Sequence, residues 1–467
     1  MVFSSLIFMW IFLPLVFCLF YLSKETYRNY LLLFASIVFY AWGEPIYILL
    51  MLISIVVNFF FGIFVDEKQN KKLYLILAIC FNLSLLGYFK YFNTFVYGIN
   101  NILGKELIAV REVALPLGIS FYTFQIMSYI IDLYRGEIKV QKNFFNLALY
   151  ISFFPQLVAG PIVKYRDIEM QIEHRLFTAE KIALGIKRFI YGIGKKVILS
   201  NSIATVVDSI FAIPLEQLSA SWVWGGVALY TLQIYYDFSG YSDMAIGLGR
   251  MFGFEFGENF NCPYISSSIK EFWRRWHISL STWFREYVYI PLGGNRRGKI
   301  RTYLNLWVVF IVTGIWHGAT LNFLLWGIWH GLFIFIERVG LSKLLEKNKV
   351  KLLNHIYAIL VIMIGWAIFR CDSLSQAIGT LNIMFDFNRV GNDLMWYNVA
   401  SIRSGVIIVI AVLLSGPMQC LFPKWKAQLY SNEKVSIIEF IVQFFILGIA
   451  IVLLVSGQYN PFIYFKF

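Results

Sequence analysis

The tripeptide Trp-His-Gly occurs twice within one apolar stretch, "TGIWHGATLNFLLWGIWHGLF", which covers residues 313–333. The first copy carries His317 and the second carries His330. The stretch is long enough to cross a bilayer, where an ionisable side chain is costly and marks a functional site by default. A neutral imidazole at such a depth is a good general base, able to take the proton from a hydroxyl that attacks an activated acyl group.

Sequence spacing distinguishes the two histidines. On one continuous helix they would be separated by about 20 Å of rise and about 220° of rotation, so they cannot share one small site. His317 lies deep in the apolar run and is followed by small residues, which let another helix or a substrate approach closely. His330 lies within eight residues of Glu337 and Arg338, which mark a membrane boundary. We interpret His330 as a satisfied or interfacial histidine and favour His317 for chemistry.

Three further histidines complete the set of five. His174 lies in a charged loop and is expected to be solvated, and His355 opens an apolar run and is expected to be interfacial. His277 is unusual, because it stands between Trp276 and an isoleucine in a segment rich in tryptophan and arginine. It can orient an acyl carbonyl or supply an oxyanion donor. A structural cluster of aromatic rings around a histidine explains the same composition.

Other motif classes are weakly supported. "GIGKK" (192–196) lacks a glycine of the phosphate-binding loop, and packing of small residues explains "GLGRMFG" (247–253) better than dinucleotide binding. In "DFSGYSD" (237–243), Asp237 and Asp243 either line a polar cavity or pair with an arginine of residues 274–301. The five cysteines show no CxxC spacing, so neither a metal site nor a disulfide framework is expected.

Composition defines the elements that must position these residues. The chain has 467 residues, of which 59% are hydrophobic and 14% charged, with a mean hydropathy of +0.67. Apolar runs near 20 residues recur from end to end, which predicts an all-α polytopic membrane protein with about 11 to 13 spans in a single domain, 1–467. The alternating pattern of an outer-membrane barrel does not appear. The apolar N-terminus is expected to be a retained first span rather than a signal peptide.

Two segments depart from simple spans. Residues 143–167 contain Pro155, Gly160 and Pro161, which predict a broken or re-entrant segment. Residues 254–301 are too polar to span and are expected to lie in the interface or to re-enter partway. Ser266, Ser267 or Ser268 should cap a helix there. We expect that helix to place four side chains near one face: Phe272, Trp276, Ser279 and Trp283.

The net charge of +13 is explained by lysine and arginine in cytoplasmic loops, and no nucleic-acid partner is expected. One cluster of cations is a possible exception. It consists of Arg274, Arg275, Arg296, Arg297 and Lys299.

Long strings of this sequence resemble the membrane-bound O-acyltransferase (MBOAT) family, in its alginate O-acetyltransferase subfamily. The similarity runs over nearly the whole length and ends with "FIYFKF" (462–467). The most specific strings are "LPLGISFYTFQIMSYIIDLYRGEI" (115–138), "FFPQLVAGPIVKY" (153–165), "SIKEFWRRWHISLSTWFREYVYIPLGGNRRG" (268–298) and "TGIWHGATLNFLLWGIWHGL" (313–332).

The resemblance implies a fold with re-entrant helices around a central tunnel, and transfer of an acyl group from a cytoplasmic donor towards an acceptor on the other face. The family's invariant histidine matches His317, as base, and its second conserved position matches His277, which would position the acyl carbonyl or the acceptor. The tunnel is expected to be lined by Trp276, Asp237, Tyr241 and Trp316. Acetyl-CoA is the expected donor substrate, and no bound cofactor or metal is expected.

The cation cluster then has two interpretations. Its side chains can hold the phosphates of acetyl-CoA by charge-assisted hydrogen bonds, or they can anchor the loop to anionic lipid headgroups. The sequence supports the two interpretations equally.

The resemblance also implies a bacterial cytoplasmic membrane location and a separate extracytoplasmic acetyltransferase partner protein that completes transfer to a polysaccharide. The teichoic acid D-alanyl transferases are a related branch, so transfer of D-alanyl or another acyl group to a cell-envelope polymer is the alternative. A transporter of lipid-linked glycan is a second alternative, although the inverted repeats common in transporters are not visible. A scaffold that recruits cell-surface assembly proteins is a third.

Overall fold

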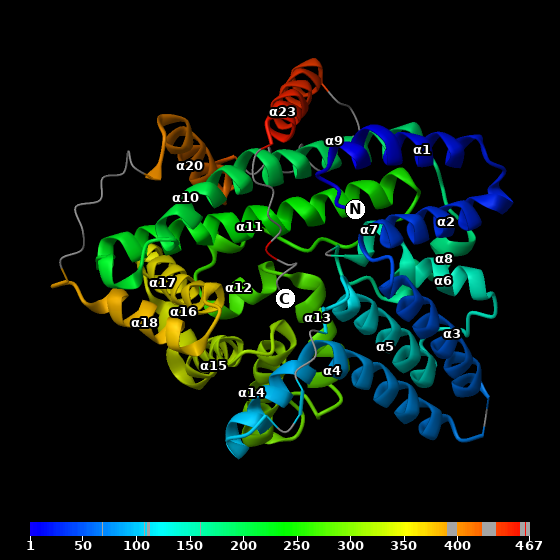
Figure 1. Ribbon diagram of the computed structural model, residues 1–467, viewed down its shortest axis with the longest axis horizontal. Helices are drawn as coiled ribbons and strands as arrows, with labels where there is room; N and C mark the ends of the chain where they lie inside the picture. Colours follow the sequence, from blue (N-terminus) through cyan, green and yellow to red (C-terminus); the bar gives the residue numbers. More distant parts are fainter. Residues whose placement is uncertain are drawn as a thin grey trace. The chain divides into compact units, whose positions relative to one another are not determined.

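A computed structural model describes the chain except for residues 68, 107, 110–112, 159, 390–398, 423–435, 458–462 and 464–467. Every regular element among the described residues is helical, which confirms the predicted fold class (Figure 1). The string "FIYFKF" lies outside the described residues apart from Ile463. The chain forms two compact units, one of residues 1–189 with 244–257 and the other of residues 190–243 with 258–467. The expectation of a single domain stays a prediction.

The first unit is built from helices at the N-terminal side of the chain. Its elements are η1 (Phe8–Phe12), α1 (Leu13–Leu22), α2 (Glu25–Gly43), α3 (Tyr47–Asp66), α4 (Lys71–Leu103), α5 (Ile119–Arg135), α6 (Phe144–Ser152), α7 (Phe154–Leu157), α8 (Tyr165–Glu173) and most of α9 (Ala179–Ile193).

The second unit carries the histidines of interest. Its elements are η2 (Gly194–Ser200), α10 (Asn201–Phe211), η3 (Leu215–Gln217), most of α11 (Ala220–Met251), η4 (Pro263–Ile265), α12 (Ile269–Arg275), α13 (Ile278–Phe284), η5 (Arg285–Tyr289), α14 (Gly298–His317), α15 (Leu321–Ile336), η6 (Glu337–Leu341), α16 (Ser342–Lys347), α17 (Lys351–Arg370), α18 (Leu374–Phe385), α20 (Ile402–Leu414), α21 (Pro417–Leu421) and α23 (Ile437–Val455).

Five described helical stretches are long and apolar enough to cross a membrane. They are Tyr47–Asp66, Lys71–Leu103, Leu321–Lys347, Lys351–Arg370 and Ile437–Val455. Two shorter apolar stretches, Phe8–Leu22 and Ile402–Leu414, accompany them. The multi-pass membrane character is therefore confirmed, and the count of 11 to 13 spans stays a prediction.

The predicted break within residues 143–167 is confirmed. The Asn143 side chain caps α6 by accepting hydrogen bonds from the backbone N–H groups of Phe145 and Asn146. The helix ends before Phe153. Pro155 then lies in the first turn of the short helix α7, where its missing N–H costs nothing. The described residues 160–164 are not helical. Non-helical backbone at membrane depth is tolerated here because these residues are nearly all buried inside the protein.

The apolar run that holds both Trp-His-Gly copies is not one helix, so the separation calculated for a single continuous helix does not apply. It folds into α14 and α15, which lie side by side (Figure 1). The chain turns at Gly318, where a Cβ atom would lie 2.1 Å from the ring of Phe323. At Gly327 a Cβ would lie 2.4 Å from the carbonyl oxygen of Phe310, so glycine permits the close packing of the two helices.

The helix expected after the serine cluster begins as predicted, with the Ser268 side chain accepting the N–H of Glu271. Its expected continuation was wrong, because the helix breaks between α12 and α13. His277 lies at the break with φ of 44°, in the left-handed region that non-glycine residues rarely adopt. A neighbouring loop stabilises the break, because the Ile278 N–H donates a hydrogen bond to the backbone carbonyl of Asn259 at 3.0 Å. Phe272 and Trp283 therefore do not share one helical face.

Candidate active site

His317 is the last residue of α14 and is 4% exposed. Aromatic rings enclose it, because its ring centroid lies 4.9 Å from that of Trp326 and 5.2 Å from that of Phe369. The contacting side chains come from α15 and α17, so three helices position this imidazole. The enclosure excludes bulk water and strengthens any electrostatic interaction made there.

His330 is also fully buried, at 0% exposure, so the interfacial position considered for it was wrong. Its ring centroid lies 5.1 Å from those of Trp326 and Trp273. Within the described part of the chain, neither of its ring nitrogens has a hydrogen-bond partner. Since Trp326 contacts both histidines, the turn after α14 brings the two Trp-His-Gly copies to one aromatic cluster, which their separation on a single helix would prevent.

His277 is 1% exposed, and its Nδ1 lies 3.1 Å from Oδ1 of Asn259. The same oxygen accepts the Ser279 backbone N–H at 3.3 Å and the Ser279 hydroxyl at 2.9 Å. A backbone N–H can only donate, so this atom of Asn259 is the carbonyl oxygen. The Asn259 amide in turn donates to the Ser242 hydroxyl at 2.9 Å. His277 must therefore carry its proton on Nδ1.

This tautomer determines what His277 can do. Burial lowers the pKa of His277 to about 3, so the ring is neutral at physiological pH. A neutral ring protonated at Nδ1 has a lone pair at Nε2, which accepts a hydrogen bond and cannot donate one. Of the roles expected for His277, the geometry thus favours accepting a hydrogen bond from an acceptor hydroxyl over stabilising an oxyanion.

One tryptophan connects the two predicted catalytic histidines. The ring of Trp316 lies 6.5 Å from that of His277 and 4.8 Å from that of His317, measured between centroids. Phe238 of α11 packs edge-on against His277 at 4.6 Å. His317, at the end of α14, and His277, at the break before α13, therefore belong to one buried cluster.

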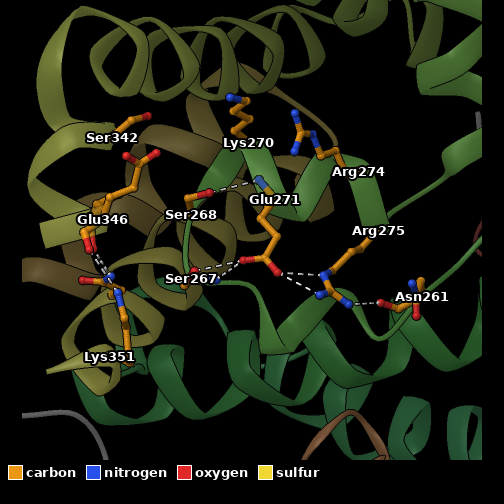
Figure 2. A pocket seen from close by; sticks show the side chains of 12 residues that line it. Asn261, Ser267, Ser268, Lys270, Glu271, Arg274, Arg275, Ser342, Glu346 and Lys351 are labelled. Carbon is orange, nitrogen blue, oxygen red and sulfur yellow. Dashed lines mark hydrogen bonds and ion pairs between the residues drawn. The ribbon is translucent and has the colours of Figure 1, made fainter. Parts of the chain in front are cut away.

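A polar pocket of about 520 Å³ lies on the outer side of α12. Figure 2 shows Lys270 and Arg274 on the same side of this helix, one turn apart, while Arg275 faces Glu271. Arg275 and Glu271 form an ion pair at 2.8 Å. Burial raises the pKa of Glu271, but hydrogen bonds from Ser267 and Arg275 outweigh that effect and lower it, so this carboxylate is ionised. The pair neutralises itself. Lys270, Arg274 and Lys351 then supply positive charge to the pocket, against one further carboxylate, that of Glu346.

The predicted cation cluster is divided by the structure. Arg274 and Arg275 line the pocket, whereas the remaining three members are exposed and do not line it: Arg296 and Arg297 on the turn before α14, and Lys299 in the first turn of α14. That turn is held by Asn295, which accepts a hydrogen bond from Arg338 at 2.6 Å. Sequence reasoning missed Lys270, although its i, i+4 spacing to Arg274 was a visible signal, and Lys351, which only the tertiary fold brings to the pocket.

The two aspartates of "DFSGYSD" pair with lysines rather than with an arginine of residues 274–301, which was one of the two alternatives for them. Asp243 binds Lys195 at 2.5 Å, and Asp237 binds Lys196 in a pair that is nearly inaccessible. Both lysines lie on η2, in the "GIGKK" string. Asp237 also accepts the backbone N–H of Ile463 at 2.8 Å.

The remaining residues expected to line a tunnel are buried. Trp276 is 2% exposed and packs against Trp366 with a centroid distance of 4.8 Å. Tyr241 and Trp316 are 3% and 5% exposed. A tunnel lined by these residues stays a prediction.

Known proteins are similar in sequence to this chain over most of its length. Residues 118–374 match the family described as MBOAT, membrane-bound O-acyltransferase family. The chain is 43% identical over 423 residues to a probable alginate O-acetylase, AlgI, of Pseudomonas aeruginosa, covering 89% of this chain and 81% of that protein. It is 32% identical to a peptidoglycan O-acetyltransferase of Helicobacter pylori, covering 100% and 98%. A teichoic acid D-alanyltransferase of Bacillus subtilis is 33% identical over 43% of this chain and 53% of that protein.

Proposed function

Because this chain belongs to the membrane-bound O-acyltransferase family, we propose that it passes an acetyl group from cytoplasmic acetyl-CoA across the membrane, for O-acetylation of an extracellular or cell-wall polysaccharide. The chain is a multi-pass membrane O-acyltransferase. The acetyl group is favoured over D-alanyl because the similarity to the two acetyl-transferring relatives covers 89% and 100% of the chain, against 43% for the D-alanyl relative.

The observation that carries this proposal is the buried cluster of His317 and His277 around Trp316, beside a helix whose outer side lines a cationic pocket. Helix α12 contributes Lys270 and Arg274 to the pocket and ends just before His277. This arrangement places a cationic pocket at one side of α12 and an aromatic cluster at its end. It fits a donor with phosphates at one end and a thioester at the other, because charge-assisted hydrogen bonds hold phosphates and the aromatic cluster excludes water from the reacting end.

The reaction needs one base and one group that orients the acceptor. A hydroxyl oxygen of the acceptor attacks the thioester carbonyl carbon as the oxygen gives its proton to His317. The carbon–sulfur bond then breaks, and the thiolate takes up that proton and leaves as the thiol of coenzyme A. The single proton of the attacking hydroxyl goes to His317, so His277 accepts a hydrogen bond at Nε2 from a neighbouring donor group of the acceptor and holds the acceptor in line. Direct transfer of this kind needs no covalent acyl-enzyme.

We infer that a separate extracytoplasmic acetyltransferase completes transfer to the polysaccharide, and that the protein works in the bacterial cytoplasmic membrane. Its acceptor hydroxyl then belongs either to the polysaccharide or to that partner. Arg296, Arg297 and Lys299 lie outside the pocket, which favours contact with anionic lipid headgroups for these three.

The test is acetyl transfer from labelled acetyl-CoA in membranes that hold the chain together with the products of its neighbouring genes. His317→Ala should reduce labelling to background at matched expression. His174→Ala is the matched control, because His174 is exposed and lies in the other compact unit. Full labelling by His317→Ala would remove the catalytic assignment and favour the transporter or the scaffold.

A further inference from the structure

A second pocket, of about 390 Å³, lies in the second unit and shares no lining residue with the cationic pocket. It is bounded by η2, α20 and α23, with Tyr236 of α11 at one wall. Most of its lining is aliphatic, and includes Ile198, Leu199, Ile410, Leu414, Val442 and Ile446. An apolar lining of this kind offers a ligand contact area rather than hydrogen bonds.

The charged groups at the pocket already have partners. Lys195 forms its ion pair with Asp243. Glu439 accepts the backbone N–H of Ser436 at 3.1 Å in the capping box that begins α23. A ligand here therefore gains little by bringing a charge, and its apolar part must supply the affinity.

The surroundings of the pocket are apolar as well. Helix α23 is long enough to cross the membrane, and its outward side chains include Phe440 at 65% and Phe444 at 68% exposure. Helix α20 shows the same character, with Val409 at 59% exposure. Such surfaces face the hydrocarbon of a bilayer, where acyl chains rather than water surround the protein.

The size of the pocket indicates what fills it. A methylene group needs about the space of one water molecule, about 30 Å³, so a pocket of about 390 Å³ matches an alkyl chain of about 13 carbons. One turn of an α-helix, with a pitch of 5.4 Å and a diameter of 10–12 Å, already needs about 420–610 Å³. A transmembrane helix of a partner protein is therefore too large.

We propose that this pocket binds one acyl chain of a membrane phospholipid. The chain lies between α20 and α23, packed against Ile198 and Leu199 of η2. It replaces contacts that an empty apolar cavity would forfeit, and so holds the two C-terminal helices against η2. Because Tyr236 lines the pocket and its hydroxyl donates to the carbonyl of Ala411 at 2.6 Å, the lipid also supports the contact between α11 and α20.

Native mass spectrometry of the full-length protein, purified in mild detergent and supplied with phosphatidylethanolamine at a few lipids per protein, tests this proposal. The wild type should retain one phospholipid mass after delipidation. Leu414→Trp fills the pocket and should lose that mass. Leu413→Trp is the matched control, because Leu413 is 44% exposed and does not line the pocket, and it should retain the lipid. No retained lipid in the wild type, or equal retention by both variants, would overturn the proposal.

A second measurement needs no variant, in case Leu414→Trp fails to fold. The wild-type protein is photolabelled with a phospholipid that carries a diazirine near the end of one acyl chain. Labels should concentrate on pocket residues such as Leu414 and Val442 at low lipid ratios. Labels spread evenly over outward residues such as Phe444 would show only the general lipid shell and overturn the proposal.

Discussion

Truncation of Asn259 is the sharpest test of how His277 is held. The Asn259 side chain makes four hydrogen bonds, to Nδ1 of His277, to the N–H and hydroxyl of Ser279, and to the hydroxyl of Ser242. In Asn259→Ala the hydroxyls can turn to new partners, but the two N–H donors cannot. Each donor left unsatisfied costs about 1–3 kcal/mol, so we expect the free energy of unfolding to fall by about 2–6 kcal/mol.

The same variant should lose acetyl transfer by about 10²-fold, because the proton of His277 is no longer confined to Nδ1. Asn259→Asp is the informative companion, since a carboxylate still accepts from His277 and Ser279, and the Ser242 hydroxyl can reverse to donate. Stability should therefore be largely kept. The added negative charge should raise the pKa of His277 from about 3 towards neutrality.

The sign of the pH effect follows from that shift. In the wild type, His277 stays neutral throughout the range from pH 8 to pH 5, so its protonation contributes no loss of activity there. In Asn259→Asp the ring takes up a proton as pH falls, Nε2 becomes a donor, and activity should fall with it. The assay is labelled acetyl transfer between pH 5 and 8, expressed as the ratio to wild type, with thermal melting of both variants. A constant ratio for Asn259→Asp, or wild-type melting and activity for Asn259→Ala, would refute the reasoning.

Three further predictions concern the surrounding machinery. Arg274→Ala should raise the KM for acetyl-CoA by about 10- to 100-fold, because one charge-assisted hydrogen bond is lost. Arg297 lies outside the pocket, so Arg297→Ala should leave the KM unchanged. Equal KM values for the two variants would show that the pocket does not bind the donor. His330→Phe should keep activity within a few-fold in the labelling assay, because a phenyl ring preserves the contact with Trp326, and a loss like that of His317→Ala would show a chemical role. Asp237→Asn leaves the Lys196 ammonium buried without its carboxylate and should cost about 3–5 kcal/mol by thermal melting; unchanged melting would contradict the pairing.

Local sequence signals were sufficient for several elements. The composition alone established a polytopic helical membrane protein, because too few charged residues are present for a soluble domain of this length. The cap at Ser268 and the break around Pro155 also followed from local chemistry, since a cap satisfies the N–H groups of its own helix and a proline acts on its own turn. The long family strings pointed to His317 and His277 before any contact was known.

Only the tertiary structure decided which distant residues meet. The turn at Gly318 folds α15 back on α14 and brings His330 to the indole that also contacts His317. The loop residue Asn259 determines where His277 carries its proton. These contacts depend on which distant segment of the chain packs against each side chain. Helical periodicity and residue type indicate which face of a helix a residue occupies, but the packing of distant segments determines which side chains it contacts. The sequence alone therefore predicted which side chains could react, and the fold determined how each is held.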